Sequence, residues 1–167
     1  MQLETVKKDI LDWCQRFVEV PHVALGGWPP CPYARQARLA GTVQILLGSD
    51  PYYDLKNRSL WGMNNLEVII YAYDPAQWDY AVFHAGIESA NTEFLLPKDL
   101  IALEDHPADV EDVMGVVMNQ GTYVLALVQS VSKLNSAAKQ IGTKGFYHDW
   151  PEDYLQALFQ HRQDPRQ

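Results

Sequence analysis

The sequence has few cysteines, no long apolar run and no secretory leader. Two cysteines in 167 residues, in a sequence that does not open like a secreted protein, indicate reduced thiols. No stretch reaches the roughly 18 apolar residues that a membrane span requires. The opening MQLETVKKDILDWC carries charges where a signal peptide has an uninterrupted apolar core. We therefore expect a cytoplasmic protein with reduced thiols and no membrane partner.

A cluster of basic residues is also missing. The formal net charge is −8, and the 13 Lys and Arg residues are scattered along the chain. Nucleic-acid binding requires a basic face that neutralises phosphates. The sequence therefore predicts no nucleic-acid partner.

Apolar side chains are plentiful. The hydrophobic fraction is 47%, and five Trp, nine Tyr and five Phe can fill a substantial core. No repeat, low-complexity tract or linker divides the chain. We expect a single α+β domain over residues 1–167, with a loose C-terminal tail at 160–167.

Hydrophobic periodicity and turn residues predict the secondary structure. The predicted helices cover 3–18, 32–39, 74–94, 132–142 and 150–162. Asp74 and Ser132 are the expected N-caps of two of them, and Pro151 the first residue of another. The predicted strands cover 42–48, 66–73 and 122–130. Residues 99–105 fit either a strand or a short helix, and 109–117 fit a helix that gives way to a strand.

The order of these elements favours a layered α+β fold. The turn-rich, aromatic segment 49–65 is predicted to be a long loop. A loop between strands 42–48 and 66–73 favours antiparallel pairing. The expected architecture is a single antiparallel or mixed sheet with helices mainly on one face, and a ferredoxin-like layout is the first candidate.

The segment WPPCPYARQAR holds the main candidate site. A helix that begins at Pro32 places Cys31 at its N-cap, where the helix dipole would lower the thiol pKa. Arg35 and Arg38, on the same side of this helix, could hold an anionic ligand, and Tyr33 is a further contact. In the alternative reading, Cys31 is buried and inert, and the prolines only fix the start of the helix. Cys14, on the apolar face of helix 3–18, is expected to be a small buried hydrophobe.

Two short motifs resemble an uncharacterised family of bacterial proteins, known only as a domain of unknown function. In that family an amphipathic N-terminal helix precedes Cys-Pro-Phe-Ala, and a later apolar strand ends in Phe-His-Pro. This chain carries CPYA at 31–34, with Tyr33 in place of Phe, and IALEDHP at 101–107. The resemblance implies that Cys31 and His106 share one site.

Two further segments could carry chemistry. LEDHPADVED (103–112) places His106 among carboxylates, which could ligate a metal or hold a general base. It has no recognisable ligand spacing, however, and also fits an acidic, solvated loop that starts a helix. GFYHDW (145–150) brings His148 among aromatic residues that could line a pocket, or that could simply fill the space between two helices.

These observations leave three hypotheses for function. The first is an enzyme or binding protein for a small anionic molecule, with catalytic Cys31 and His106 and with Tyr33, Arg35, Arg38 and His148 as ligand contacts. The second is a non-catalytic homo-oligomer, such as a homodimer, that uses the aromatic segment 49–65. The third is a metal-dependent enzyme at 104–112. No motif identifies a cofactor.

Overall fold

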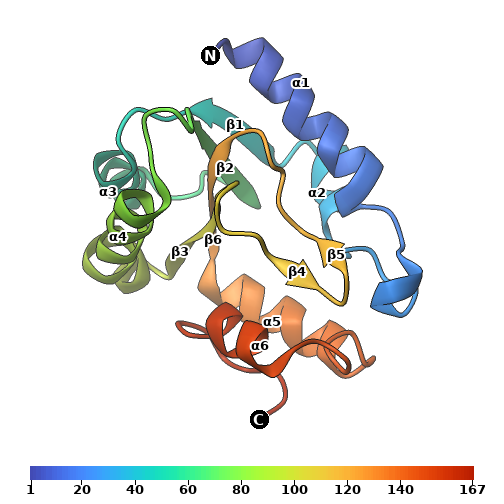
Figure 1. Cartoon of the computed structure of the whole chain (residues 1–167). Coiled ribbons are helices and arrows are strands. Elements are labelled where there is room, and N and C mark those ends of the chain that lie inside the picture. Colours follow the sequence, from blue (N-terminus) through green and yellow to red (C-terminus); the bar gives the residue numbers. More distant parts are fainter.

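The computed structural model describes all residues, 1–167, and its centre is a mixed four-stranded sheet (Figure 1). The strand order is β1-β2-β6-β3, with β1 parallel to β2 and with β6 antiparallel to both of its neighbours. These strands are β1 (Val43–Leu47), β2 (Val68–Tyr73), β3 (Leu100–Asp105) and β6 (Val124–Ser130). A separate small hairpin consists of β4 (Asp112–Val113) and β5 (Val116–Val117).

Helices cover both faces of the sheet. The α-helices are α1 (Leu3–Trp13), α2 (Ala34–Leu39), α3 (Pro51–Trp61), α4 (Tyr80–Ala90), α5 (Val131–Gly142) and α6 (Glu152–Leu158). The short turns are the π-helices η1 (Cys14–Val18) and η3 (Asn91–Leu95) and the 3-10 helices η2 (Val23–Leu25) and η4 (Leu96–Lys98). Figure 1 shows α3 and α4 on one side of the sheet, α1 on the other, and α5 and α6 beneath it. The predicted α+β class with a mixed sheet is confirmed.

Three apolar clusters hold these layers together. Phe83 and Ile87 of α4 and Leu55 of α3 pack with the sheet residues that face them. Val6 and Ile10 of α1 pack against the opposite face. The third cluster joins α5 and α6 through the segment between them. None of the helices is long and apolar enough to cross a bilayer.

The segment 49–65, predicted to be a loop, contains the helix α3, so that prediction is wrong. Asp50 is the N-cap and accepts a hydrogen bond from the backbone N–H of Tyr53 at 3.2 Å, and Pro51 occupies the first turn. A helical crossover lets adjacent strands run parallel, so the predicted antiparallel pairing of β1 and β2 is also wrong. A ferredoxin-like chain follows the order β-α-β-β-α-β, whereas here helices follow both β1 and β2.

Several predicted boundaries also shift. α4 begins after Asp79, which accepts from the N–H of Val82, and Asp74 lies in the turn before it. Ser130, and not Ser132, caps α5. Pro151 precedes α6 instead of opening it. In each case the correct cap lies within a few residues of the predicted one, because several Asp, Ser and Pro residues near these helix starts have suitable chemistry.

Three further segments agree with the predictions only in part: 99–105, 109–117 and the C-terminal residues 160–167, which were expected to be a loose tail. Residues 99–105 form the strand β3, which resolves the ambiguity there, whereas 109–117 contains no helix and ends in the β4–β5 hairpin. The C-terminal residues 160–167 contact α5 and α6. The N–H of Gln163 donates to Oδ1 of Asn135 at 3.1 Å, and Arg166 pairs with Glu152 at 2.6 Å.

Candidate functional site

A cavity with a volume of about 460 Å³ lies on the α1 side of the sheet. Its walls come from η1, α2 and α5, and its floor comes from β1, β2 and β6. Fifteen of its twenty-two lining residues are hydrophobic, among them Leu11, Val18, Ile70, Leu127 and Leu134. Cavities of this size and composition are typical of small-molecule sites.

Cys31 lines this cavity, but it is not a helix cap. α2 begins at Ala34, and Tyr33 takes the N-cap position. The N–H of Cys31 donates to the carbonyl of Val18 at 3.2 Å, which ties the segment to η1. Burial raises the pKa of the Cys31 thiol, although the N–H groups of Tyr33 and Ala34 oppose this shift. The predicted lowering of this pKa is therefore wrong.

A second thiol, that of Cys14, lines the same cavity. Burial raises the pKa of Cys14 to about 11, and the negative charge of Glu19 adds to the shift. Both thiols are therefore protonated at neutral pH. Neither is activated as a nucleophile, because the thiolate is the reactive form.

Alkylation should report this protection directly. At pH 8 we expect iodoacetamide to modify Cys14 about 100-fold more slowly than an ordinary cysteine, because a pKa near 11 leaves little thiolate. Cys31 should also react slowly in the folded protein, and both should react fast after unfolding in urea. Peptide mass spectrometry resolves the two sites. Rapid modification of Cys31 at pH 6 would contradict this assignment.

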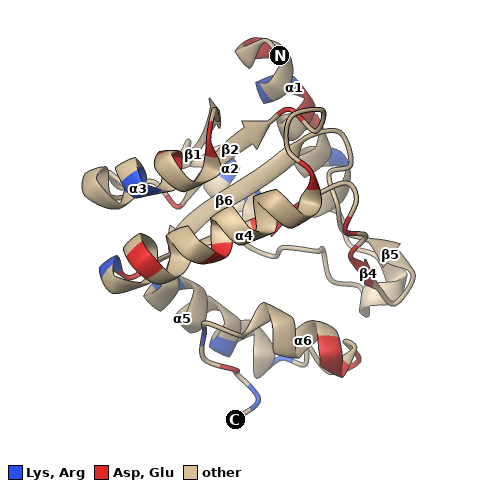
Figure 2. Ribbon diagram, turned by 60° about the vertical axis from the view of Figure 1, so that its left-hand side comes forward, with Lys and Arg blue, Asp and Glu red and all other residues tan.

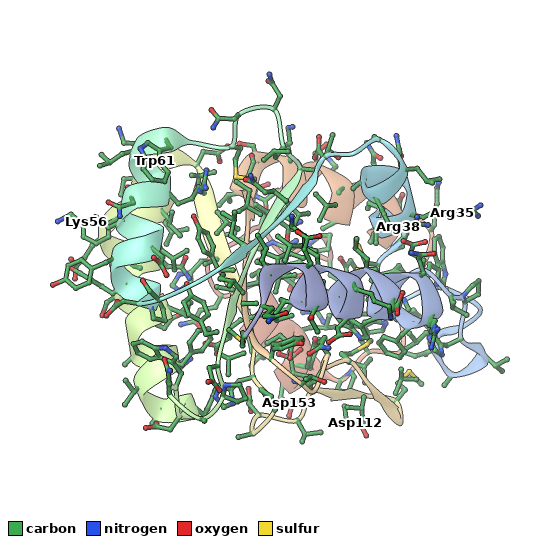
Figure 3. The ribbon with its side chains drawn as sticks, turned by 90° about the horizontal axis from the view of Figure 1, so that it is seen from above. Arg35, Arg38, Lys56, Trp61, Asp112 and Asp153 are labelled. Carbon is green, nitrogen blue, oxygen red and sulfur yellow. The ribbon has the colours of Figure 1, made fainter.

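The two arginines predicted to hold an anion are placed differently. Arg38 lines the cavity, but its Nε and Nη2 donate to the two carboxylate oxygens of Glu19 at 2.6 and 2.9 Å. Glu19 is buried, with only 6% of its side chain exposed, so this pair belongs to the cavity wall. Arg35 is exposed and reaches outward at the rim of the molecule beside α2 (Figure 3). Neither guanidinium is free inside the cavity.

The other charged residues of the cavity are also paired. Lys133 of α5 donates to Glu67 at 3.0 Å, and both line the cavity. Tyr33 donates to the carbonyl of Ala137 at 3.3 Å and so links the start of α2 to α5. The charges around the cavity therefore cancel in pairs, which leaves an apolar interior with a neutral rim.

His106 lies far from Cys31, against the expectation from the family resemblance. It follows the C-terminal end of β3, whereas the cavity is lined by Val43 and Val68 at the start of β1 and β2. Because β2 and β3 both run antiparallel to β6, these are opposite ends of the sheet. His106 also packs on Phe83 of α4, on the opposite face.

The hydrogen bonds of His106 assign it a structural role. The N–H of Ala108 donates to Nδ1 at 3.0 Å, so this nitrogen must be unprotonated. Nε2 then donates to the carbonyl of Trp78, also at 3.0 Å. His106 is 5% exposed, and both ring nitrogens are satisfied. The predicted catalytic role for His106 is therefore not supported.

The side chain of Asn119 makes several hydrogen bonds to the segment 104–112, which was predicted as a possible metal site. Its Nδ2 lies within 3.2 Å of Asp105 Oδ1 and of the carbonyl oxygens of His106 and Asp109. Its Oδ1 accepts from the N–H of Glu111 at 2.7 Å. No group of three or more His, Cys, Asp or Glu side chains is placed as metal ligands would be. The side chain of Asn119 thus holds this loop together through hydrogen bonds. The hypothesis of a metal site at 104–112 gains no support from this arrangement.

Acidic side chains nevertheless gather around this loop. Figure 2 shows acidic residues near the β4–β5 hairpin and at the first turn of α6. Glu104 pairs with Nδ1 of His84 at 2.7 Å. Glu111 accepts from the Tyr154 hydroxyl at 3.0 Å, and burial raises its pKa to about 7, with Asp105, Asp109 and Glu104 adding to the shift. The pKa of Glu111 thus falls in the physiological range.

The two remaining candidate segments, 145–150 and 49–65, contribute no residue to the cavity. The side chain of His148 is 83% exposed, so it does not join the cavity, while Phe146 and Tyr147 beside it fill the third cluster. In α3, Tyr52 packs on Phe94, whereas the large side chains that remain exposed are Tyr53, Leu60 and Trp61. His148 is therefore not among the residues that line the cavity.

Several cavity residues could not be recognised from the sequence. Cys14 packs against the second apolar cluster, as expected, and also lines the cavity. Nothing in the sequence indicates that Glu19 would neutralise Arg38 or that Glu67 would meet Lys133. These partners lie 19 and 66 positions apart. Only the assembled fold brings them together.

Comparison with protein families, with curated proteins and with solved structures returns no match for this chain.

Proposed function

We propose that the protein binds a small, uncharged, largely apolar molecule in the cavity between η1, α2, the sheet and α5. The observation that supports this most directly is the cavity itself, about 460 Å³ in volume and lined mainly by hydrophobic residues. An apolar ligand would gain about 25 cal/mol for each Å² of apolar surface that it removes from water. A ligand with a few tens of heavy atoms would fill this volume.

The charges around the cavity favour a neutral ligand over the anion expected from the sequence. An anion would have to draw Arg38 from Glu19, or Lys133 from Glu67. Drawing Arg38 away would leave the buried Glu19 carboxylate unpaired, which is costly. A neutral ligand disturbs neither pair.

Binding is also better supported than catalysis through Cys31. A cysteine nucleophile requires a base or a lowered pKa. The pKa of Cys31 is raised, and His106 lies at the other end of the sheet. His22 is the histidine nearest to Cys31 in sequence, and its Nε2 lies 3.4 Å from the carbonyl oxygen of Phe17. The thiols of Cys14 and Cys31 are therefore assigned as soft, polarisable parts of the cavity wall.

A neutral fluorescent probe tests this function. We expect N-phenyl-1-naphthylamine to bind with a blue-shifted, enhanced emission and a micromolar dissociation constant. The variant Ala137→Phe adds a ring to the wall of the cavity and should weaken binding at least tenfold. Its matched control is Ser136→Phe, the next residue of α5, which is exposed and does not line the cavity.

Three outcomes would count against the proposal. Absence of probe binding by the folded wild type would remove its basis. Equal loss of binding in Ala137→Phe and Ser136→Phe would place the probe elsewhere or reflect general destabilisation. Much tighter binding of the anionic probe 1-anilinonaphthalene-8-sulfonate would favour the anion after all.

A further inference from the structure

The two edges of the central sheet differ in what covers them. β1 and β3 are the edge strands, and each has one row of backbone groups that points away from the sheet. Exposed edges can pair with strands of other chains, and proteins usually block them with charges, prolines, bulges or covering elements. The contrast between these two edges indicates where a partner strand could add.

The β3 edge is blocked. Asn91, at the start of η3, donates from Nδ2 to the carbonyl of Ala102 at 3.0 Å and accepts from its N–H at 2.8 Å. The amide of Asn91 therefore takes the place of a neighbouring strand. Asn91 is 2% exposed, so η3 covers this edge completely at its middle.

The β1 edge has no such cover. The N–H of Val68 donates to the carbonyl of Thr42, and the N–H of Gly48 donates to the carbonyl of Ala72. The backbone groups of the even-numbered residues of β1 therefore face β2. The backbone groups of Val43, Ile45 and Leu47 therefore point outward. No side chain or loop of this chain bonds to them. In Figure 3, seen from above, β1 crosses in front of the sheet between α3 and α1.

The β1 sequence is complementary to itself. VQILL contains no charge and no proline, so nothing in it opposes pairing. An antiparallel copy centred on Ile45 would place Val43 opposite Leu47 of the second copy, and Ile45 opposite its own equivalent. All three outward residues would then exchange both backbone hydrogen bonds, as a two-fold interface requires.

We infer that the protein forms a symmetric homodimer in which the two β1 strands pair antiparallel and join the sheets into one. Stable interfaces bury about 1,200 Å² of surface or more, and pairing of two five-residue strands alone buries less than this. α3, the helix beside this edge in Figure 3, presents Leu60 and Trp61, which are 74% and 63% exposed. In the proposed dimer, these side chains would add apolar surface to that of the paired strands. The inference does not depend on the cavity or its ligand.

Sedimentation velocity of the full chain across a concentration series tests the dimer. We expect a monomer–dimer equilibrium in the micromolar range. Leu47→Pro removes an outward N–H without removing a β1–β2 bond, and prolines are tolerated on edge strands at such positions. It should raise the dimer dissociation constant at least tenfold. Leu60→Ser, on α3, should also weaken the dimer but by less, and the control Val117→Ser, at an exposed residue of β5 in the separate hairpin, should leave it unchanged.

Amide exchange of the wild type keeps the inference testable if Leu47→Pro fails to fold. The amides of Val43, Ile45 and Leu47 should become protected as concentration rises, while those of Gln44 and Leu46 are protected throughout. A wild type that stays monomeric at several hundred micromolar would overturn the inference. So would a dimer that Leu60→Ser abolishes while the outward β1 amides stay unprotected, because that dimer would use the α3 surface alone.

Discussion

Asn91→Leu is expected to destabilise the protein by about 3 kcal/mol, a large share of the stability of a domain of this size. Asn91 is buried and makes two hydrogen bonds to Ala102 in the middle of β3. Leucine has a similar volume but satisfies neither group. Each buried backbone group left unpaired costs about 1–3 kcal/mol.

Urea unfolding of wild type and variants measures this loss. Asn57→Leu is the matched control, because Asn57 is exposed on α3 and its side chain has no hydrogen bond in the structure. That change should stay within about 0.5 kcal/mol. Asn91→Asp should also destabilise strongly, since a carboxylate cannot donate to the Ala102 carbonyl. An Asn91→Leu variant as stable as the wild type would show that Asn91 does not seal the β3 edge.

Glu111→Gln is expected to stabilise the protein by up to about 3 kcal/mol at pH 8 and to leave it almost unchanged at pH 4. Burial raises the pKa of Glu111 from its usual 4.5 to about 7. The folded state therefore holds the proton more tightly than the unfolded chain does. Each pKa unit is worth about 1.36 kcal/mol.

The sign of this pH dependence is unusual for a carboxyl group. Below pH 4.5 the group is protonated in both states, so its contribution is constant. Between pH 4.5 and 7 the unfolded chain releases the proton first, and stability falls as pH rises. Burial also raises the pKa values of Glu104 and Asp105, which act in the same direction.

Thermal unfolding of both proteins across this pH range checks the prediction. Asp149→Asn is the control, because it makes the equivalent change from carboxylate to amide on a side chain that is 69% exposed. The Tyr154 hydroxyl can still donate to the amide oxygen of glutamine. A gain from Glu111→Gln that is equal at pH 4 and pH 8 would contradict the raised pKa.

The sequence predicted the class of the fold better than its connections. The strands 42–48, 66–73 and 122–130 and the amphipathic helix that begins at Leu3 are present because their periodicity reflects burial on one or both faces. α3 was missed because its turn residues and aromatics suggest a loop, although Asp50 and Pro51 form a regular helix start. That single error reversed the predicted direction of β1 relative to β2.

The chemistry of the candidate segment depends on residues outside it. Cys31, Tyr33 and Arg38 line the cavity. Their chemistry differs from expectation because burial and the partner Glu19 come from other parts of the chain. His106 was joined to Cys31 by a motif resemblance, and only the topology shows that the sheet separates them.

The most direct test of the proposed function is a methyl NMR titration of the wild type with N-phenyl-1-naphthylamine. Binding in the cavity predicts saturable shifts of the methyl groups of Val18, Ile70, Leu127 and Leu134, which line it. The methyl groups of Leu55 and Ile87, in the core on the opposite face, should stay unchanged. Absence of shifts at saturating probe, or shifts confined to Leu60 on the surface of α3, would contradict a ligand site in the cavity.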